Sequence, residues 1–291
     1  MFDIAIRSLN ALLMIAMPLV LGVYLYRRLG TGWRLFGVGA LTFIASQLLH
    51  IPFNIWVLNP LIRGLDELMT STPYLIAAAL LLGLSAGVFE EVARYLVYRF
   101  RLRGKRDRNG ASALMLGAGH GGIESIIIGI LVIYGFVRLF AYKDASLETL
   151  IPIDQVETVR SQVELFWSLP WYGAILGAIE RAATLCFHMA ATMLVLQVFR
   201  RKNILWLFAA IGWHAFYDAM AVYASQTWSV YVTEALIVAA GIASIALIFL
   251  LRDKPVGLED ESSAKTDTML SLIHISEPTR LNSTSRMPSS A

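Results

Sequence analysis

The chain has 291 residues, of which 57% are hydrophobic and 15% are charged. Soluble domains carry about 25% charged residues, and a fold of this size has too little polar surface to enclose so many apolar side chains. The composition therefore excludes an ordinary water-soluble domain and predicts an integral membrane protein. A single cysteine, Cys186, excludes an intrachain disulfide and a CxxC site, and we expect it to pack as a small apolar side chain.

Seven apolar stretches are long enough to cross a bilayer, which takes about 20 helical residues. We therefore expect an all-α fold, a polytopic membrane helix bundle of about seven transmembrane helices, with residues 1–251 as a single transmembrane domain. Between the fourth and fifth stretches, segment 140–169 predicts a short amphipathic helix on the membrane surface. In chain order the stretches lie at 8–26, 35–58, 74–98, 111–139, 170–199, 204–224 and 229–251.

The Lys and Arg residues of the loops predict the orientation of the bundle. Fourteen of them follow the first, third, fifth and seventh stretches, whereas the remaining loops carry four or five. The positive-inside rule places the richer side in the cytoplasm, so we expect the N-terminus outside and the C-terminus cytoplasmic. These basic loops serve topology and contact with the anionic lipid bilayer, and we expect no nucleic-acid partner.

The end of the chain differs in pattern from the rest. Residues 252–269 predict a short cytoplasmic tail. From Leu270 to Arg280 the chain reads LSLIHISEPTR, which resembles the conceptual translation of a transposase adapter used in DNA sequencing libraries. We therefore interpret 270–291 as a non-native, adapter-derived tail and leave His274 out of the candidate ligands.

Four of the predicted helices carry ionisable side chains deep in the membrane. A charged group at the bilayer centre costs about 2.5–3.5 kcal/mol on insertion scales, so a cluster of such groups predicts a functional site. By contrast, we expect His50 in the second stretch, which has no partner motif, to be an ordinary hydrogen-bonded core residue. The cluster comprises Glu90, Glu91, Arg94, His120, Glu124, Glu180, Arg181, His188, His214 and Asp218.

The depths of four of these residues agree. Glu90, His120, His188 and His214 each lie about 10 residues from the predicted cytoplasmic end of their helix, which is about 15 Å at 1.5 Å per residue. That depth is close to the midplane of a hydrocarbon core about 30 Å thick. Helices of opposite direction are therefore expected to bring one carboxylate and three histidines to the same level.

The spacings also place polar partners on common helix faces. Glu90 and Arg94, His120 and Glu124, and His214 and Asp218 are all i,i+4 pairs, which face the same way on a helix. The glycines of segment 117–122 allow neighbouring helices to approach closely, and they favour a kink or a broken turn there.

Such a set can activate water for hydrolysis. A buried Glu can act as general base, and His side chains can bind zinc or donate hydrogen bonds to a developing oxyanion. The chain has no HExxH motif, so several helices would have to supply the ligands of any metal. The candidate ligands are His120, His188 and His214, together with Glu90 or Glu124.

Three short motifs carry a resemblance to a known family. EExxR at Glu90–Arg94, HGxxE at His120–Glu124 and HxxxD at His214–Asp218 resemble the YhfC-type intramembrane metalloproteases, within the wider PrsW and CAAX-processing membrane protease group. The likeness covers about residues 74–224, the motif-bearing core. The first motif falls between the EExxxR and EExxK forms of that group, and Leu116 stands where its second motif has Phe.

The resemblance implies a hydrolase that cleaves a membrane-embedded or membrane-associated peptide or protein within the bacterial cytoplasmic membrane. It implies that Glu90 activates water with His120, that Glu91 and Arg94 position it, and that Glu124 belongs to the second motif. His214 and Asp218 would stabilise the oxyanion or complete a metal site. The resemblance leaves open whether the cofactor is Zn²⁺ or whether the glutamate acts without metal.

Two other classes of function use the same residues differently. A proton- or metal-ion-coupled transporter could employ the buried His and Glu groups as a relay, although the chain has no evident inverted repeat of the kind many transporters contain. A non-enzymatic membrane scaffold would tolerate the combined loss of Glu90 and His120, which a peptidase could not. The sequence does not predict the oligomeric state.

Overall fold

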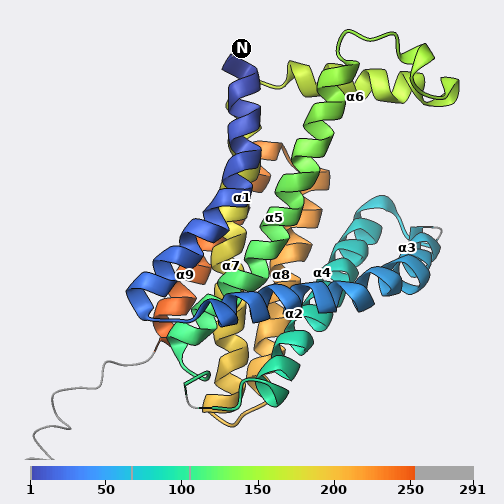
Figure 1. The fold of residues 1–291 in the computed structure, drawn as a ribbon. Coiled ribbons are helices and arrows are strands. Elements are labelled where there is room, and N and C mark those ends of the chain that lie inside the picture. The colour runs from blue at the N-terminus through green and yellow to red at the C-terminus, as the bar shows by residue number, and fades with distance from the viewer. Residues whose placement is uncertain (1, 67, 105, 253–291) are drawn as a thin grey trace, which may run out of the picture. The chain divides into compact units, whose positions relative to one another are not determined.

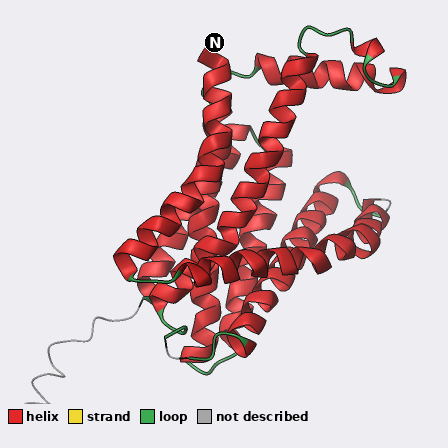
Figure 2. Cartoon of the chain, viewed as in Figure 1, coloured by secondary structure: helices red, strands yellow, loops and turns green. Residues whose placement is uncertain are grey.

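The computed structural model describes residues 2–66, 68–104 and 106–252, and these ranges contain helices but no strand (Figures 1 and 2). Three short 3₁₀ turns, at Leu147–Thr149, Ile153–Gln155 and Gly173–Ile175, connect longer elements. The longer elements are α1 (Phe2–Leu29), α2 (Trp33–Phe53), a π-helical turn (Asn54–Leu58), α3 (Asn59–Asp66), α4 (Ser71–Phe100), α5 (Gly110–Tyr142), α6 (Val156–Ser168), α7 (Leu176–Arg200), α8 (Leu205–Thr227) and α9 (Val230–Leu251).

Seven of the described helical segments are long and apolar enough to cross a membrane, which confirms the predicted all-α fold with about seven spans. The second segment runs from Trp33 to Asp66, eight residues beyond its predicted end at 58, because the π turn and α3 continue directly from α2. Pro52 and Pro60 lie on either side of that turn and lack the backbone N–H that a regular α-helix needs, which accounts for the change of helix type.

Of the segments predicted to be cytoplasmic, the described parts of the α1–α2, α4–α5 and α7–α8 loops and the end of α9 lie at the end of the bundle opposite the N-terminus (Figure 1). The assignment of this end to the cytoplasm remains a prediction. Segment 140–169, predicted to contain an amphipathic surface helix, does contain a helix, α6, at the same end as the N-terminus, and its place on the membrane surface stays a prediction. Trp167 of α6 donates a hydrogen bond to the carbonyl of Leu139 (3.3 Å), and the guanidinium of Arg7 lies 4.2 Å from the ring centre of Phe166.

Helix α7 forms the centre of the bundle. In its most apolar part, 83% of the residues are buried, whereas no other span exceeds 44%. It contacts α5 and α9 extensively, and α5 in turn packs against α1 and α2 while α4 packs against α8. The chain positions from Phe187 to Val198 are therefore enclosed by protein, and a polar side chain on this part of α7 must find its partners on the neighbouring helices.

Close helix contacts depend on glycine where α2 crosses α5. A Cβ atom on Gly39 would overlap the carbonyl of Leu116, and one on Gly119 would overlap the carbonyl of Phe36. This backbone contact confirms the predicted close approach. Helix α5 nevertheless continues unbroken from Gly110 to Tyr142, so the glycines cause no broken turn there.

Residues from 253 onward fall outside the described ranges. Apart from Arg252, both predicted parts of the tail, 252–269 and 270–291, therefore lie outside the described ranges and stay predictions.

The contact between α2 and α5 gives a first testable prediction. We expect Gly119→Ala to destabilise the bundle by about 1–3 kcal/mol, because the added methyl group forces the two backbones apart. Gly135→Ala on the same helix is the matched control, since no heavy atom lies near the position of its Cβ. Thermal unfolding of both purified variants in detergent measures the difference. Equal melting temperatures would mean that the α2–α5 contact is not tight.

Candidate functional site

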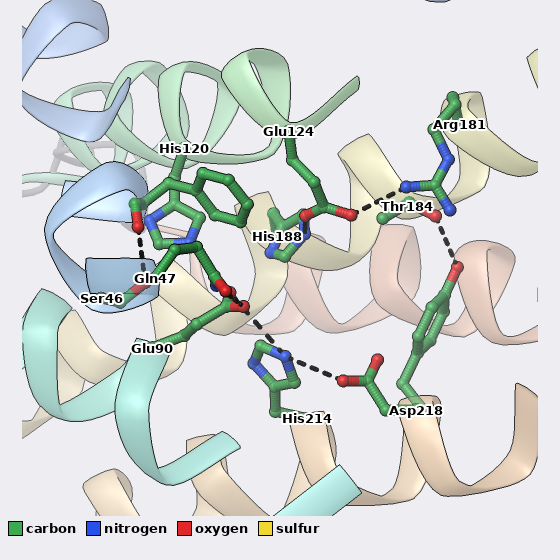
Figure 3. A network of polar contacts seen from close by, with 12 residues as sticks. Ser46, Gln47, Glu90, His120, Glu124, Arg181, Thr184, His188, His214 and Asp218 are labelled. Carbon is green, nitrogen blue, oxygen red and sulfur yellow. Dashed lines mark hydrogen bonds and ion pairs between the residues drawn. The ribbon is translucent and has the colours of Figure 1, made fainter. Parts of the chain in front are cut away.

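The side chains of the three motifs meet in one polar network, and Figure 3 shows the part of it around Glu90, His120 and His214. Helix α4 supplies Glu90, Glu91 and Arg94, α5 supplies His120 and Glu124, α7 supplies Arg181 and His188, and α8 supplies His214 and Asp218. Arg94 and the side chains around it are buried, whereas Asp218 and Glu124 retain 34% and 19% exposure. The site is thus closed on the Arg94 side and more open at these two carboxylates.

Glu90 occupies the middle of this network. Its Oε2 atom lies 2.9 Å from His120 Nε2, 3.7 Å from a terminal nitrogen of Arg94 and 3.8 Å from His214 Nε2. Its other oxygen, Oε1, accepts a hydrogen bond of 3.1 Å from the side-chain amide of Gln47. The carboxylate is therefore fixed by a residue of α2 on one side and faces two imidazoles with the other oxygen.

Arg94 binds partners on two helices. One terminal nitrogen, Nη1, pairs with the carboxylate of Glu91, and the other, Nη2, donates to Nδ1 of His188 at 2.7 Å. The guanidinium is fully buried, as is Glu91. Because two ionised groups without water need each other, Glu91 offsets the charge of Arg94 within α4, and the hydrogen bond from Arg94 to His188 links α4 to α7.

His188 uses both of its ring nitrogens. Arg94 can only donate, so Nδ1 of His188 is the acceptor and Nε2 carries the proton, which it donates to Glu124 Oε2 at 2.6 Å. The other oxygen of Glu124 accepts a hydrogen bond of 2.8 Å from Arg181, which also pairs with Glu180. His120 and Glu124, spaced i,i+4, lie on one face of α5, but they do not bind each other. His120 binds Glu90 of α4 and Glu124 binds His188 of α7.

His214 lies between three carboxylates. Its Nδ1 donates to Glu91 Oε1 at 2.7 Å, and its Nε2 is 3.4 Å from Asp218 Oδ2, one helical turn away. With Nδ1 committed to Glu91, Nε2 faces Glu90 and Asp218 and is the nitrogen of His214 available for chemistry.

Sequence patterns did not reveal the contribution of α2. Gln47 binds Glu90, the ring of Phe43 packs edge-on against His120 with centroids 5.3 Å apart, and His50 lies on the same face. A lone Gln or His in an apolar span forms no motif. The only available signal was helical spacing, since Gln47 follows Phe43 by four residues and His50 follows Gln47 by three. His50 is buried and hydrogen-bonded to Ser85, as predicted for a core residue, but its side chain also lines the site.

A cavity of about 330 Å³ opens onto these groups. It is polar where the motifs meet and apolar elsewhere, which suits a peptide segment better than a free ion alone. Tyr217, another residue without a sequence signal, contributes to its wall and hydrogen-bonds Thr184 at 3.2 Å. The walls include Phe43, Gln47, His50, Glu90, Glu124, Arg181, Thr184, Phe187, His188, His214, Tyr217 and Asp218.

The donor set fits a metal ion. Glu90, His120 and His188 each offer one ligand atom, and these atoms all lie within 4.8 Å of one another. One carboxylate and two imidazoles are the protein ligands of many catalytic zinc sites. His214, predicted as a third imidazole ligand, is not part of this group and lies beside it. Because Arg94 occupies Nδ1 of His188 and Glu124 occupies Nε2, His188 can bind a metal only by releasing one of them.

Comparison with known proteins identifies the family. Residues 13–242 match the model of the YhfC intramembrane metalloprotease family. The chain belongs to the YhfC family. It is also 30% identical over 252 residues to the uncharacterized membrane protein YhfC of Bacillus subtilis strain 168, a match that covers 86% of this chain and 95% of the relative. No solved structure matches the chain.

Membership of the YhfC family confirms the predicted resemblance and agrees with an integral membrane location. The matched range begins well before residue 74, the predicted start of the motif-bearing core, and includes all of α2. The family thus extends over the helix that carries Gln47 and His50.

The buried ion pair gives a second prediction. We expect Arg94→Ala to destabilise the protein by about 3–5 kcal/mol, because Glu91 would be left buried without its cation. The matched control is Arg138→Ala on the exposed part of α5, which should leave the thermal transition unchanged. Differential scanning fluorimetry of the detergent-solubilised proteins compares them. An Arg94 variant as stable as the wild type would show that the contacts of Arg94 with Glu91 and His188 do not stabilise the bundle.

Proposed function

We propose that this YhfC-family chain is an intramembrane peptidase that hydrolyses a peptide bond of a membrane-embedded or membrane-associated substrate. The observation that carries the proposal is the position of Glu90. Its carboxylate lies on the cavity, is held by Gln47 through Oε1, and presents Oε2 to His120 and His214. A carboxylate oriented in this way is placed to remove a proton from a water molecule.

The proposed reaction begins with Glu90 as general base. Oε2 accepts a proton from water in the cavity, and the resulting hydroxide attacks the carbonyl carbon of the scissile bond. Arg94 and Glu91 keep Glu90 and His214 in position from behind. Glu91 accepts a hydrogen bond from His214, Arg94 lies 3.7 Å from Glu90, and neither of the two faces the cavity. Their proposed role is therefore positioning.

His214 is the proposed donor to the oxyanion. Glu91 holds Nδ1, so Nε2 is presented to the cavity in a fixed direction. When protonated, Nε2 can donate to the negative oxygen of the tetrahedral intermediate, and such preorganised donors lower reaction barriers strongly. Asp218, 3.4 Å from Nε2, supports the protonated form of the imidazole.

We further propose that the site holds zinc. Glu90, His120 and His188 would bind the ion, which would supply Lewis-acid activation of water or of the carbonyl group. Oε2 of Glu90 can then accept the proton of water only while it is not bound to the ion. Charge supports this proposal. The network contains five carboxylates and only two guanidiniums. Three negative charges therefore remain if the histidines are neutral, and two if His214 is protonated, and an excess of buried charge of one sign needs a counterion. The groups are Glu90, Glu91, Glu124, Glu180 and Asp218 with Arg94 and Arg181.

The first experiment identifies the substrate. We expect Glu90→Gln to reduce peptide cleavage by at least about 1,000-fold while the protein still inserts and folds, because the amide cannot accept the proton from water. Comparative membrane proteomics of cells that express the wild type or Glu90→Gln would reveal a protein cut in the first and intact in the second. Gln197→Ala, a buried polar residue of α7 outside the site, is the control. Cleavage by both Glu90 forms would reject the proposal, and ion uptake into proteoliposomes without cleavage would favour a transporter.

The second experiment concerns the metal. We expect about one zinc ion per purified chain by inductively coupled plasma mass spectrometry. In His120→Ala we expect zinc affinity to fall by at least about 10- to 100-fold, the loss that already follows when a hydrogen-bond partner of a ligand is removed. Removal of zinc with a chelator should abolish cleavage, and added zinc should restore it. Full activity in metal-free protein would instead support a glutamate mechanism without metal.

A further inference from the structure

His50 is a buried titratable group that the mechanism above does not use. It lies near the end of α2, is 7% exposed, and lines the same cavity as Glu90, His214 and Asp218. Its ring stacks on Phe89 of α4, with centroids 5.1 Å apart and an angle of 24° between the ring planes. The ring is therefore held in one orientation.

The tautomer of His50 follows from its partner. Ser85 Oγ donates its single proton to the carbonyl of Leu82 at 2.9 Å, so it can only accept from His50 Nε2, which is 3.0 Å away. Nε2 of His50 is then protonated, and in the neutral ring Nδ1 carries the lone pair. Within the described part of the chain, Nδ1 forms no hydrogen bond.

The other described histidines differ in this respect. His188 has a partner at each nitrogen, and His214 has one at Nδ1 and carboxylates around Nε2. His120 faces Glu90 with Nε2, and its unpartnered Nδ1 is enclosed by protein. Among the histidines of residues 2–252, only His50 combines a place on the cavity wall with a ring nitrogen that is neither paired nor enclosed.

Peptide hydrolysis requires a group that can give a proton to the departing amine nitrogen. After hydroxide attacks, the carbon–nitrogen bond breaks only if the amine nitrogen receives a proton, because an amide anion is a very poor leaving group. We propose that His50 is the general acid of the reaction: the proton that Glu90 takes from water passes through the cavity to His50 Nδ1, and from there to the departing nitrogen. The bond to carbon breaks with its electron pair on nitrogen, and His50 returns to its neutral form. This inference rests on the proposed peptidase function.

The test compares two leaving groups. One probe is the peptide that spans the cleavage site found by proteomics, and the other is the p-nitrophenyl ester of its acyl half, whose p-nitrophenolate departs without a proton. In proteoliposomes, His50→Gln should lower kcat for the peptide by about 100-fold while the ester loses less than about threefold and KM for both stays similar. Glu90→Gln should lose both activities. Thr42→Val, a residue of α2 that lines a separate apolar groove against α4, is the matched control and should retain both.

Chemical rescue adds a second readout. The cavity has room for imidazole, so imidazole added to His50→Ala should restore peptide cleavage in part, which a purely structural role of His50 could not explain. Equal losses on peptide and ester, or full peptide cleavage by folded His50→Gln, would overturn the assignment of His50 and leave the role of Glu90 intact. If the wild-type chain cleaves neither probe, the peptidase proposal fails and the role of His50 fails with it.

Discussion

The buried guanidinium of Arg94 must be offset by protein groups, because no solvent reaches it. Its partners are Glu91 on its own helix and His188 on α7, and through them it is linked to His214 on α8 and to Glu124 on α5. Four helices are thus connected by one chain of hydrogen bonds in a place where each unpaired group would be costly. The geometry of Glu90 depends on this arrangement, since Arg94 and His214 approach the same oxygen of its carboxylate.

Backbone packing makes these contacts possible. A Cβ on Gly121 would lie 2.6 Å from the ring of His188, and one on Gly117 would lie 2.7 Å from the backbone of Met189. Only glycine at these positions lets α5 approach α7 closely enough for Glu124 to reach His188. The glycines of α5 therefore set the distance between α5 and α7 that the hydrogen bond between Glu124 and His188 requires.

Helix periodicity and hydropathy were sufficient to predict the seven spans and the faces that carry Glu90, His120 and His214, because both follow from residue spacing along a single helix. Which side chains bind each other across two helices depends on how the helices pack, and residue spacing along one helix does not predict that packing. The i,i+4 rule paired His120 with Glu124, whereas His120 binds Glu90 and Glu124 binds His188. Gln47 was not predicted for the same reason, because its role depends on the hydrogen bond it donates to Glu90, 43 residues away in the sequence.

The position of Arg94 also determines how His188 could bind a metal. Histidine ligands usually donate their second ring N–H to an acceptor, often a carboxylate. His188 already donates Nε2–H to Glu124 in this manner, so the nitrogen left for a metal is Nδ1, where Arg94 now donates. Binding would exchange one cation for another at that nitrogen, while Arg94 keeps its pair with Glu91. If the ion displaced Glu124 at Nε2 instead, His188 would have to lose both ring protons, because Arg94 would still require the lone pair of Nδ1. Metal ligation by His188 is therefore coupled to a movement of Arg94, the residue that holds the four helices together.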